Sequence, residues 1–128
     1  MKRSHSLGEL QLVIMRILWQ QGEATVADVH SRLLEERGLA PTTVATMLVK
    51  MEKKGVVAHR SEGRKFVYHP TVTEEQVRQS MVDELTERVF AGNATALVAH
   101  LVAEQEIDAA ELEKLKQLIR QHEEKEEH

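Results

Sequence analysis

The sequence has no cysteine, only 2 prolines and 6 glycines, and no apolar run long enough to cross a membrane. The lack of cysteine excludes a disulfide framework, thiolate metal centres and cysteine nucleophiles. With 41% hydrophobic and 30% charged residues, the composition favours a soluble helical protein over a disordered chain. The basic N-terminus meets Glu9 before any hydrophobic stretch, so it does not look like a secretory signal and we expect a cytoplasmic protein.

The sequence also lacks the patterns that indicate an enzyme or a metal protein. It has no nucleophile elbow, phosphate-binding loop or constellation of paired carboxylates, so we expect no catalytic residue and no enzymatic activity. The 7 histidines are scattered, without a pair four residues apart, and the pattern predicts neither a metal site nor a cofactor.

The net charge of −4 is distributed unevenly. Residues 1–80 carry 12 Lys and Arg against 9 Asp and Glu, whereas residues 81–128 carry 5 against 12. Within residues 41–70 the count is 6 basic against 2 acidic. A basic region followed by an acidic half is typical of a protein in which one part contacts nucleic acid. Chance asymmetry on an ordinary solvated surface is the alternative.

Residues 41–54 predict a short helix that ends at Gly55 and has two different sides. The apolar side should pack inward and carries Val44, Met47, Leu48 and Met51. The opposite side carries Thr43, Thr46, Lys50 and Lys53. Threonine hydroxyls can bond to base edges and phosphates, and lysines neutralise backbone charge. This pattern is typical of a DNA-reading helix, although a solvated face on a protein-interaction module has the same composition.

Two further helices are expected before this one. Ser6 and Glu9 have capping-box spacing, which predicts a helix to about Gln20. Thr25 and Asp28 predict the cap of a second helix over residues 26–37. The residues of that helix expected to face inward are Val26, Val29, Leu33 and Leu34. Three short helices with glycine-containing connections form a helix-turn-helix pattern.

Two β-prone runs, residues 56–61 and 65–69, follow the third helix and flank Gly63. They predict a hairpin whose loop has two or three residues. A helix-turn-helix followed by a hairpin is a winged helix. Basic residues gather near the expected tip of the wing, where they would reach phosphates or the minor groove: Arg60, Arg64 and Lys65.

The aromatic side chains are expected to be structural. Trp19 ends an apolar helical stripe, which favours core packing or a dimer contact over a ligand or DNA contact. Phe66 and Tyr68 alternate on the second strand of the hairpin. We expect them to pack the wing onto the helices, the alternative being stacking on bases.

The second half of the sequence predicts three amphipathic helices. Thr73 and Gln76 form a capping box for a helix to about Phe90, residues 95–104 continue as an alanine-rich helix, and Asp108 caps the last one. Their apolar stripes would be too exposed alone, which favours a homodimer over packing onto the winged helix of the same chain. The predicted dimerisation residues are Leu85, Val89, Leu97, Leu101, Leu112, Leu115, Leu118 and Ile119.

The predicted fold is therefore mainly α with a small β-hairpin. Residues 1–71 are expected to form an N-terminal winged helix-turn-helix domain that binds DNA, and residues 72–128 a C-terminal helical dimerisation domain. The alternative function is a winged-helix protein-interaction module without sequence-specific DNA binding.

Six blocks of the sequence, in their order and spacing, resemble the penicillinase repressor family, which is also called BlaI/MecI/CopY. They are residues 7–19, 22–29, 42–48, 53–57, 62–70 and 90–101. The resemblance implies a bacterial homodimeric repressor that binds a palindromic operator with TACA/TGTA-like half-sites. It implies base reading by Thr42, Thr43, Thr46 and Lys50, with phosphate or wing contacts from Lys53, Lys54, Arg60, Arg64 and Lys65.

The resemblance also implies a route by which repression ends. Members that regulate beta-lactamase or related genes respond to a membrane sensor with a metalloprotease domain, which leads to cleavage in the dimerisation helices. The corresponding bond here lies near His100 and Leu101, where cleaved members carry a different residue before the bond. The copper-responsive branch has a cysteine cluster, and its absence here excludes thiolate sensing of copper or zinc.

Overall fold

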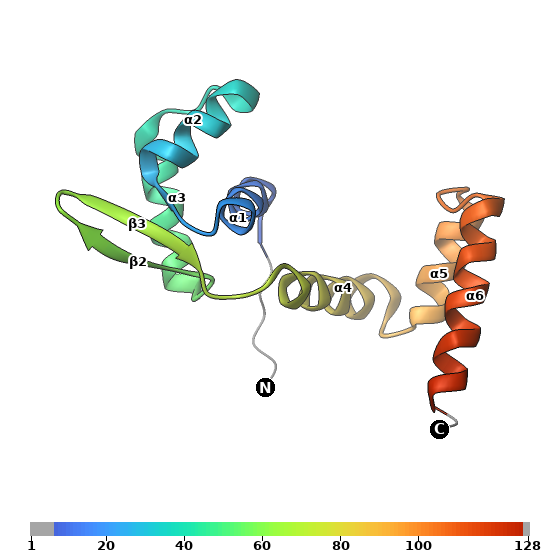
Figure 1. Cartoon of the computed structure of the whole chain (residues 1–128). Helices are drawn as coiled ribbons and strands as arrows, with labels where there is room; N and C mark the ends of the chain where they lie inside the picture. The colour runs from blue at the N-terminus through green and yellow to red at the C-terminus, as the bar shows by residue number, and fades with distance from the viewer. Residues whose placement is uncertain (1–6, 127–128) are drawn as a thin grey trace. The chain divides into compact units, whose positions relative to one another are not determined.

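The computed structural model describes residues 7–126, apart from the side chains of residues 35–37. These residues form two compact units, one ending at Glu84 and the other beginning at Leu85. The first unit contains α1 to α3, a small sheet and the first part of α4, and the second contains the end of α4 with α5 and α6 (Figure 1). The prediction of a mainly helical fold with a small β-hairpin is confirmed.

Helix α1 (Glu9–Gln21) supplies much of the core of the first unit. Its residues Ile14, Met15 and Leu18 are completely buried. Gly8 is the N-cap, with its backbone N–H donating to Gln11 Oε1 at 3.4 Å. The helix therefore starts at Glu9, and Ser6, the expected capping residue, lies outside the described residues.

Helix α2 (Val26–Arg37) has the predicted bounds and the predicted capping box. The Asp28 N–H donates to Thr25 Oγ1 at 3.1 Å, and the Thr25 N–H donates to Asp28 Oδ2 at 3.0 Å. The bond from the Thr25 N–H, followed by the interaction with the Thr25 side chain, lowers the pKa of the Asp28 carboxyl. Leu33 is buried, but Leu34 is 54% exposed, so the expectation that Leu34 faces inward is wrong. Adjacent helical residues project about 100° apart, and in α2 the inward direction belongs to Leu33.

Helix α3 (Pro41–Lys54) also has the predicted bounds, with proline in its first turn. Gly55 ends it in the left-handed conformation at φ 82°, which a side chain would disfavour. Val44, Leu48 and Met51 are completely buried against the other helices, and their burial fixes which side of α3 faces outward.

The sheet has three antiparallel strands in the order β1-β3-β2, namely β1 (Ala24–Thr25), β2 (Val57–Glu62) and β3 (Lys65–Pro70). Glu62 pairs with Lys65, so the hairpin loop has two residues, with Gly63 at φ 64°. This resolves the loop length that the sequence left open. The sequence did not predict β1, because two residues are too short to show strand alternation.

Helix α4 (Glu74–Phe90) begins at the predicted capping box, in which the Gln76 N–H donates to Thr73 Oγ1 at 3.0 Å. Val77, near its start, is buried in the core of the first unit. The Trp19 indole N–H donates to the Val72 carbonyl at 2.9 Å, and its ring packs against the same core. The first part of α4 thus belongs to the first unit, which ends at Glu84.

The second unit contains α5 (Ala94–Ala103) and α6 (Ala109–Glu126). The Asn93 side chain caps α5 by accepting from the Ala96 N–H at 3.0 Å, and Asp108 caps α6 by accepting from the Glu111 N–H at 2.8 Å. No described residue of α5 or α6 is fully buried. No helix among residues 7–126 is long and apolar enough to cross a membrane.

Candidate nucleic-acid interface

The outward side of α3 carries the residues that the sequence assigned to base reading. Its polar members are all solvent-exposed: Thr42, Thr43, Thr46, Lys50 and Lys53. Among the described residues, Lys50 and Lys53 have no ion-pair partner, so both ammonium groups are available to a polyanion. We call this side of α3, with Val49, the reading face.

Side-chain bonds from the neighbouring helices hold α3 in place. His30 of α2 bonds through Nε2 to the Leu39 carbonyl at 2.8 Å and so ties α2 to the turn before α3. Gln11 of α1 donates to Met47 Sδ at 3.2 Å and accepts from Lys54 Nζ at 2.8 Å. Lys54, at the end of α3, therefore differs from Lys53, because its ammonium bonds to the Gln11 side chain of α1.

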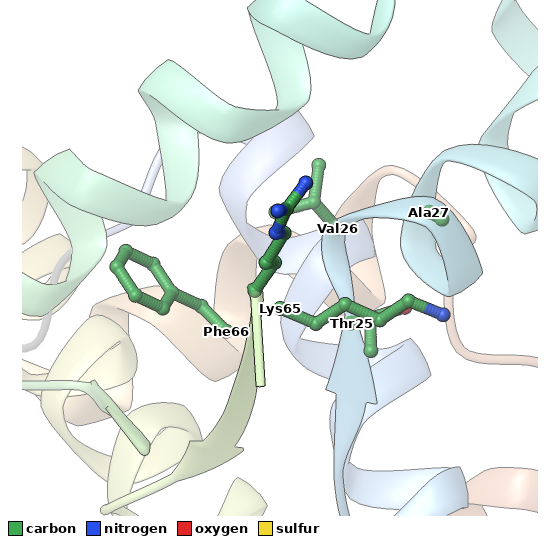
Figure 2. Close-up of a pocket in the computed structure, with 6 residues that line it drawn as sticks. Thr25, Val26, Ala27, Lys65 and Phe66 are labelled. Atoms are coloured by element: carbon green, nitrogen blue, oxygen red, sulfur yellow. The ribbon is translucent and has the colours of Figure 1, made fainter. Parts of the chain in front are cut away.

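The tip of the wing brings Arg64 and Lys65 together beside the start of α2. Both side chains are exposed, and with Thr25, Val26, Ala27 and Phe66 they line a shallow depression. Figure 2 shows the Phe66 ring directed away from Thr25 in this region. The Lys65 ammonium also contributes to the lowered pKa of Asp28, after the two bonds from Thr25. The wing tip therefore carries two adjacent positive charges, on Arg64 and Lys65.

A second set of contacts joins the wing to the end of α3. His59 of β2 bonds through Nδ1 to Glu52 Oε1 at 2.5 Å. Its ring lies 4.4 Å from that of Phe66 and 5.4 Å from that of Tyr68, measured between centroids. Tyr68 is buried, and this burial, with the nearby charge of Glu52, raises its pKa. Tyr68 packs into the core of the first unit as expected, whereas Phe66 remains 48% exposed, so the expectation that Phe66 also packs the wing onto the helices is wrong.

Arg60 differs from the other basic residues of the wing because acidic side chains of the protein pair with it. Its guanidinium donates to both carboxylate oxygens of Glu23, at 2.5 and 3.0 Å, and to Glu62 at 3.2 Å. The bond from Arg60 lowers the pKa of Glu23, and Glu23 in turn raises the pKa of Arg60. The pair joins the end of the α1–β1 connection to the wing, so Arg60 offers less net charge to DNA than its position in the sequence indicated.

Val49 is a reading-face residue that the sequence analysis assigned to neither side of α3. It is 48% exposed and lies between Thr46 and Lys53. The spacing of Val49 in the sequence could have indicated this position. Val49 follows Thr42 by seven residues and Thr46 by three, which places all three on one side of a helix.

The predicted dimerisation residues lie on α4, α5 and α6 and form no buried core within the chain. Leu85, Val89, Leu118 and Ile119 are exposed, and Leu97, Leu101, Leu112 and Leu115 are half-buried. His100 is exposed on α5 and its ring lies 5.9 Å from that of Phe90, whereas the neighbouring Leu101 is half-buried. Among the described residues, no cluster of three or more histidine and acidic side chains could hold a metal ion.

Known proteins with similar sequences are transcriptional regulators. The BlaI regulator of Mycobacterium tuberculosis is 36% identical over 107 residues, which cover 82% of this chain and 78% of that protein. The penicillinase repressor of Bacillus licheniformis is 25% identical over 122 residues, which cover 95% of each chain. The model of the penicillinase repressor family matches residues 7–121.

Two solved structures of repressors resemble the chain as well. The solution structure of the DNA-binding domain of the repressor BlaI has a TM-score of 0.53 at 32% identity. The monomeric form of Bacillus licheniformis BlaI in complex with the blaP half-operator has a TM-score of 0.51, also at 32% identity. Each comparison covers 59% of this chain and 93% of the other. With the family model matching nearly its whole length, the chain belongs to the penicillinase repressor family, whose members are transcriptional repressors and not enzymes.

Proposed function

We propose that this chain is a cytoplasmic transcriptional repressor that binds a palindromic operator as a homodimer. The observation that supports the proposal is the reading face, which presents exposed hydroxyl and ammonium groups on a helix whose other side is buried at Val44, Leu48 and Met51. Such a helix can enter the major groove while the fold holds its orientation. The cationic wing tip at Arg64 and Lys65 would contact the flanking backbone.

The homodimer part of the proposal rests on the second unit. Its helices carry apolar side chains along their length, yet no described residue of α5 or α6 is fully buried. A second copy of the same chain would cover these stripes with identical stripes, as two-fold symmetry allows. The dimer would also place two reading faces on one side of DNA, at a spacing of about 34 Å or a multiple of it.

Operator selection from a random duplex pool tests the proposal, followed by salt titration of the affinity on the selected site. We expect a two-fold palindrome and an affinity that falls steeply with salt. Equal and weak binding to every duplex would overturn the proposal and favour the protein-interaction module.

The Thr46→Ala variant tests base reading within that operator. We expect it to weaken specific binding by about 1 kcal/mol or more, the scale of a lost base contact, while binding to unrelated duplexes stays the same. Thr95→Ala, a matched change at an exposed threonine of α5, should bind as the unmodified protein does. An unchanged affinity of Thr46→Ala for the operator would remove Thr46 from the base-reading residues.

Arg60 is proposed to position the wing rather than to neutralise a phosphate. Lys53→Ala should reduce the slope of log K against log salt by about 1, because a free ammonium is lost from the interface. Arg60→Ala should change this slope much less, because Glu23 and Glu62 already pair with the guanidinium. Equal reductions of the slope in the two variants would show that Arg60 leaves Glu23 to bind DNA.

Proteolysis in α5 is the route to derepression that we propose, with a sensor metalloprotease as the partner. The bond between His100 and Leu101 lies inside the helix, so α5 must open locally before it can be cut. Within a single chain few packing contacts oppose such opening, because no described residue of α5 is fully buried. Beta-lactamase or related genes are the proposed targets.

A further inference from the structure

Val49 occupies an unusual position on the reading face. It is 48% exposed, and it is the large apolar side chain that α3 leaves open to solvent among the described residues. The adjacent Leu48 is completely buried, so Leu48 rather than Val49 supplies the apolar contact with the core. Other exposed apolar residues lie on other elements, as Leu34 does on α2 and Phe66 on β3.

Helix formation does not account for a valine at this position. Branching at Cβ restricts the side chain within a helix and makes valine a poorer helix former than alanine or leucine. Val49 also takes no part in the buried core of the first unit. Its two methyl groups are therefore available to a partner that reaches the same side of α3 as Thr46 and Lys53.

The chemistry of the surrounding residues limits which chemical group of the partner Val49 can contact. Thr46 and Lys53 can hydrogen-bond to base edges and phosphates, whereas the branched aliphatic side chain of Val49 forms no hydrogen bond. In the major groove the apolar group presented by the bases is the C5-methyl of thymine. On the basis of the proposed function, we infer that Val49 contacts a thymine methyl in each half-site and so selects thymine at one operator position.

Replacing thymine by deoxyuridine tests this inference, because it removes the methyl group and leaves the pattern of donors and acceptors unchanged. Each thymine of the selected operator is replaced in both half-sites together, and the full chain is compared with the Val49→Ala variant. At one position we expect the unmodified protein to bind about fourfold more weakly per half-site, the effect of one lost apolar group. Val49→Ala should be insensitive to the same replacement, which shows coupling between the side chain and the methyl.

Thr46→Ser is the matched control, because it removes a methyl group from the reading face one turn away and keeps the hydroxyl. It should remain sensitive to deoxyuridine at the Val49 position. Loss of sensitivity in Thr46→Ser but not in Val49→Ala would assign the contact to Thr46 and overturn the inference. Equal sensitivity of the unmodified protein and Val49→Ala at every thymine would also overturn it, while leaving the repressor function intact. Failure to select any operator would overturn both.

Discussion

The Leu115→Asp variant is expected to be monomeric and to bind its operator at least a hundredfold more weakly than the unmodified protein. Leu115 is half-buried on the apolar stripe of α6, beside exposed Leu118 and Ile119. In the proposed dimer this stripe would be covered, and an unpaired carboxylate there would lose its hydration without gaining a partner. The variant would therefore dissociate rather than retain a buried charge.

The size of the loss of affinity follows from the linkage of two half-site contacts. In a dimer the second winged unit binds at an effective concentration set by the first, which raises affinity by about 10²–10⁴ without any new contact. A monomer retains the contacts of one half-site and loses this gain. Analytical ultracentrifugation measures the dissociation of the dimer, and titration of the full operator measures the affinity.

Gln117→Asp is the matched control for this prediction. Gln117 is exposed on α6, two residues from Leu115 and on the opposite side of the helix, and the substitution introduces the same charge. It should remain dimeric and bind the operator normally, apart from a small electrostatic effect. A Leu115→Asp protein that sediments as a dimer would show that the α6 stripe is not the interface, and the stripes of α4 and α5 would then be tested.

The sequence predicted the helices well because their ends carry explicit signals. The capping boxes at Thr25, Thr73 and Asp108 and the glycine at 55 place the ends of α2, α4, α6 and α3. The apolar residues of α3 were assigned to the correct side, since three of the four are completely buried and Met47 is partly buried. Local signals of this kind depend on residues close in sequence, which is why they can be seen without a structure.

The features that the sequence did not predict depend on contacts between distant residues. Strand β1 forms because Ala24 and Thr25 pair with Tyr68 and Val67, and neither residue alone has a strand pattern. The pairing of Arg60 with Glu23 joins residues far apart in the chain, so Arg60 looked like a free cation. Val49 was assigned to neither side of α3, because its apolar side chain differs from the hydroxyl and ammonium groups of the outward side and its spacing differs from that of the inward apolar residues.

Leu48→Ala is the second large effect that we expect, and it should act on folding rather than on DNA recognition. Leu48 is completely buried on the inner side of α3, and shortening it leaves a cavity in the core of the first unit. Such substitutions lower the free energy of unfolding by about 2–5 kcal/mol, out of a typical total of about 5–15 kcal/mol. Denaturant unfolding monitored by the fluorescence of Trp19, the single tryptophan of the chain, measures the change.

Thr46→Ala provides the comparison that separates stability from recognition, because it changes the same helix two residues away on the exposed side. It should alter the free energy of unfolding by about 0.5 kcal/mol or less while weakening operator binding. Leu48→Ala should do the reverse: at a temperature where it remains folded, its operator affinity should stay close to that of the unmodified protein. If Leu48→Ala loses operator affinity while fully folded, the core behind α3 sets the position of the reading face as well as the stability of the unit.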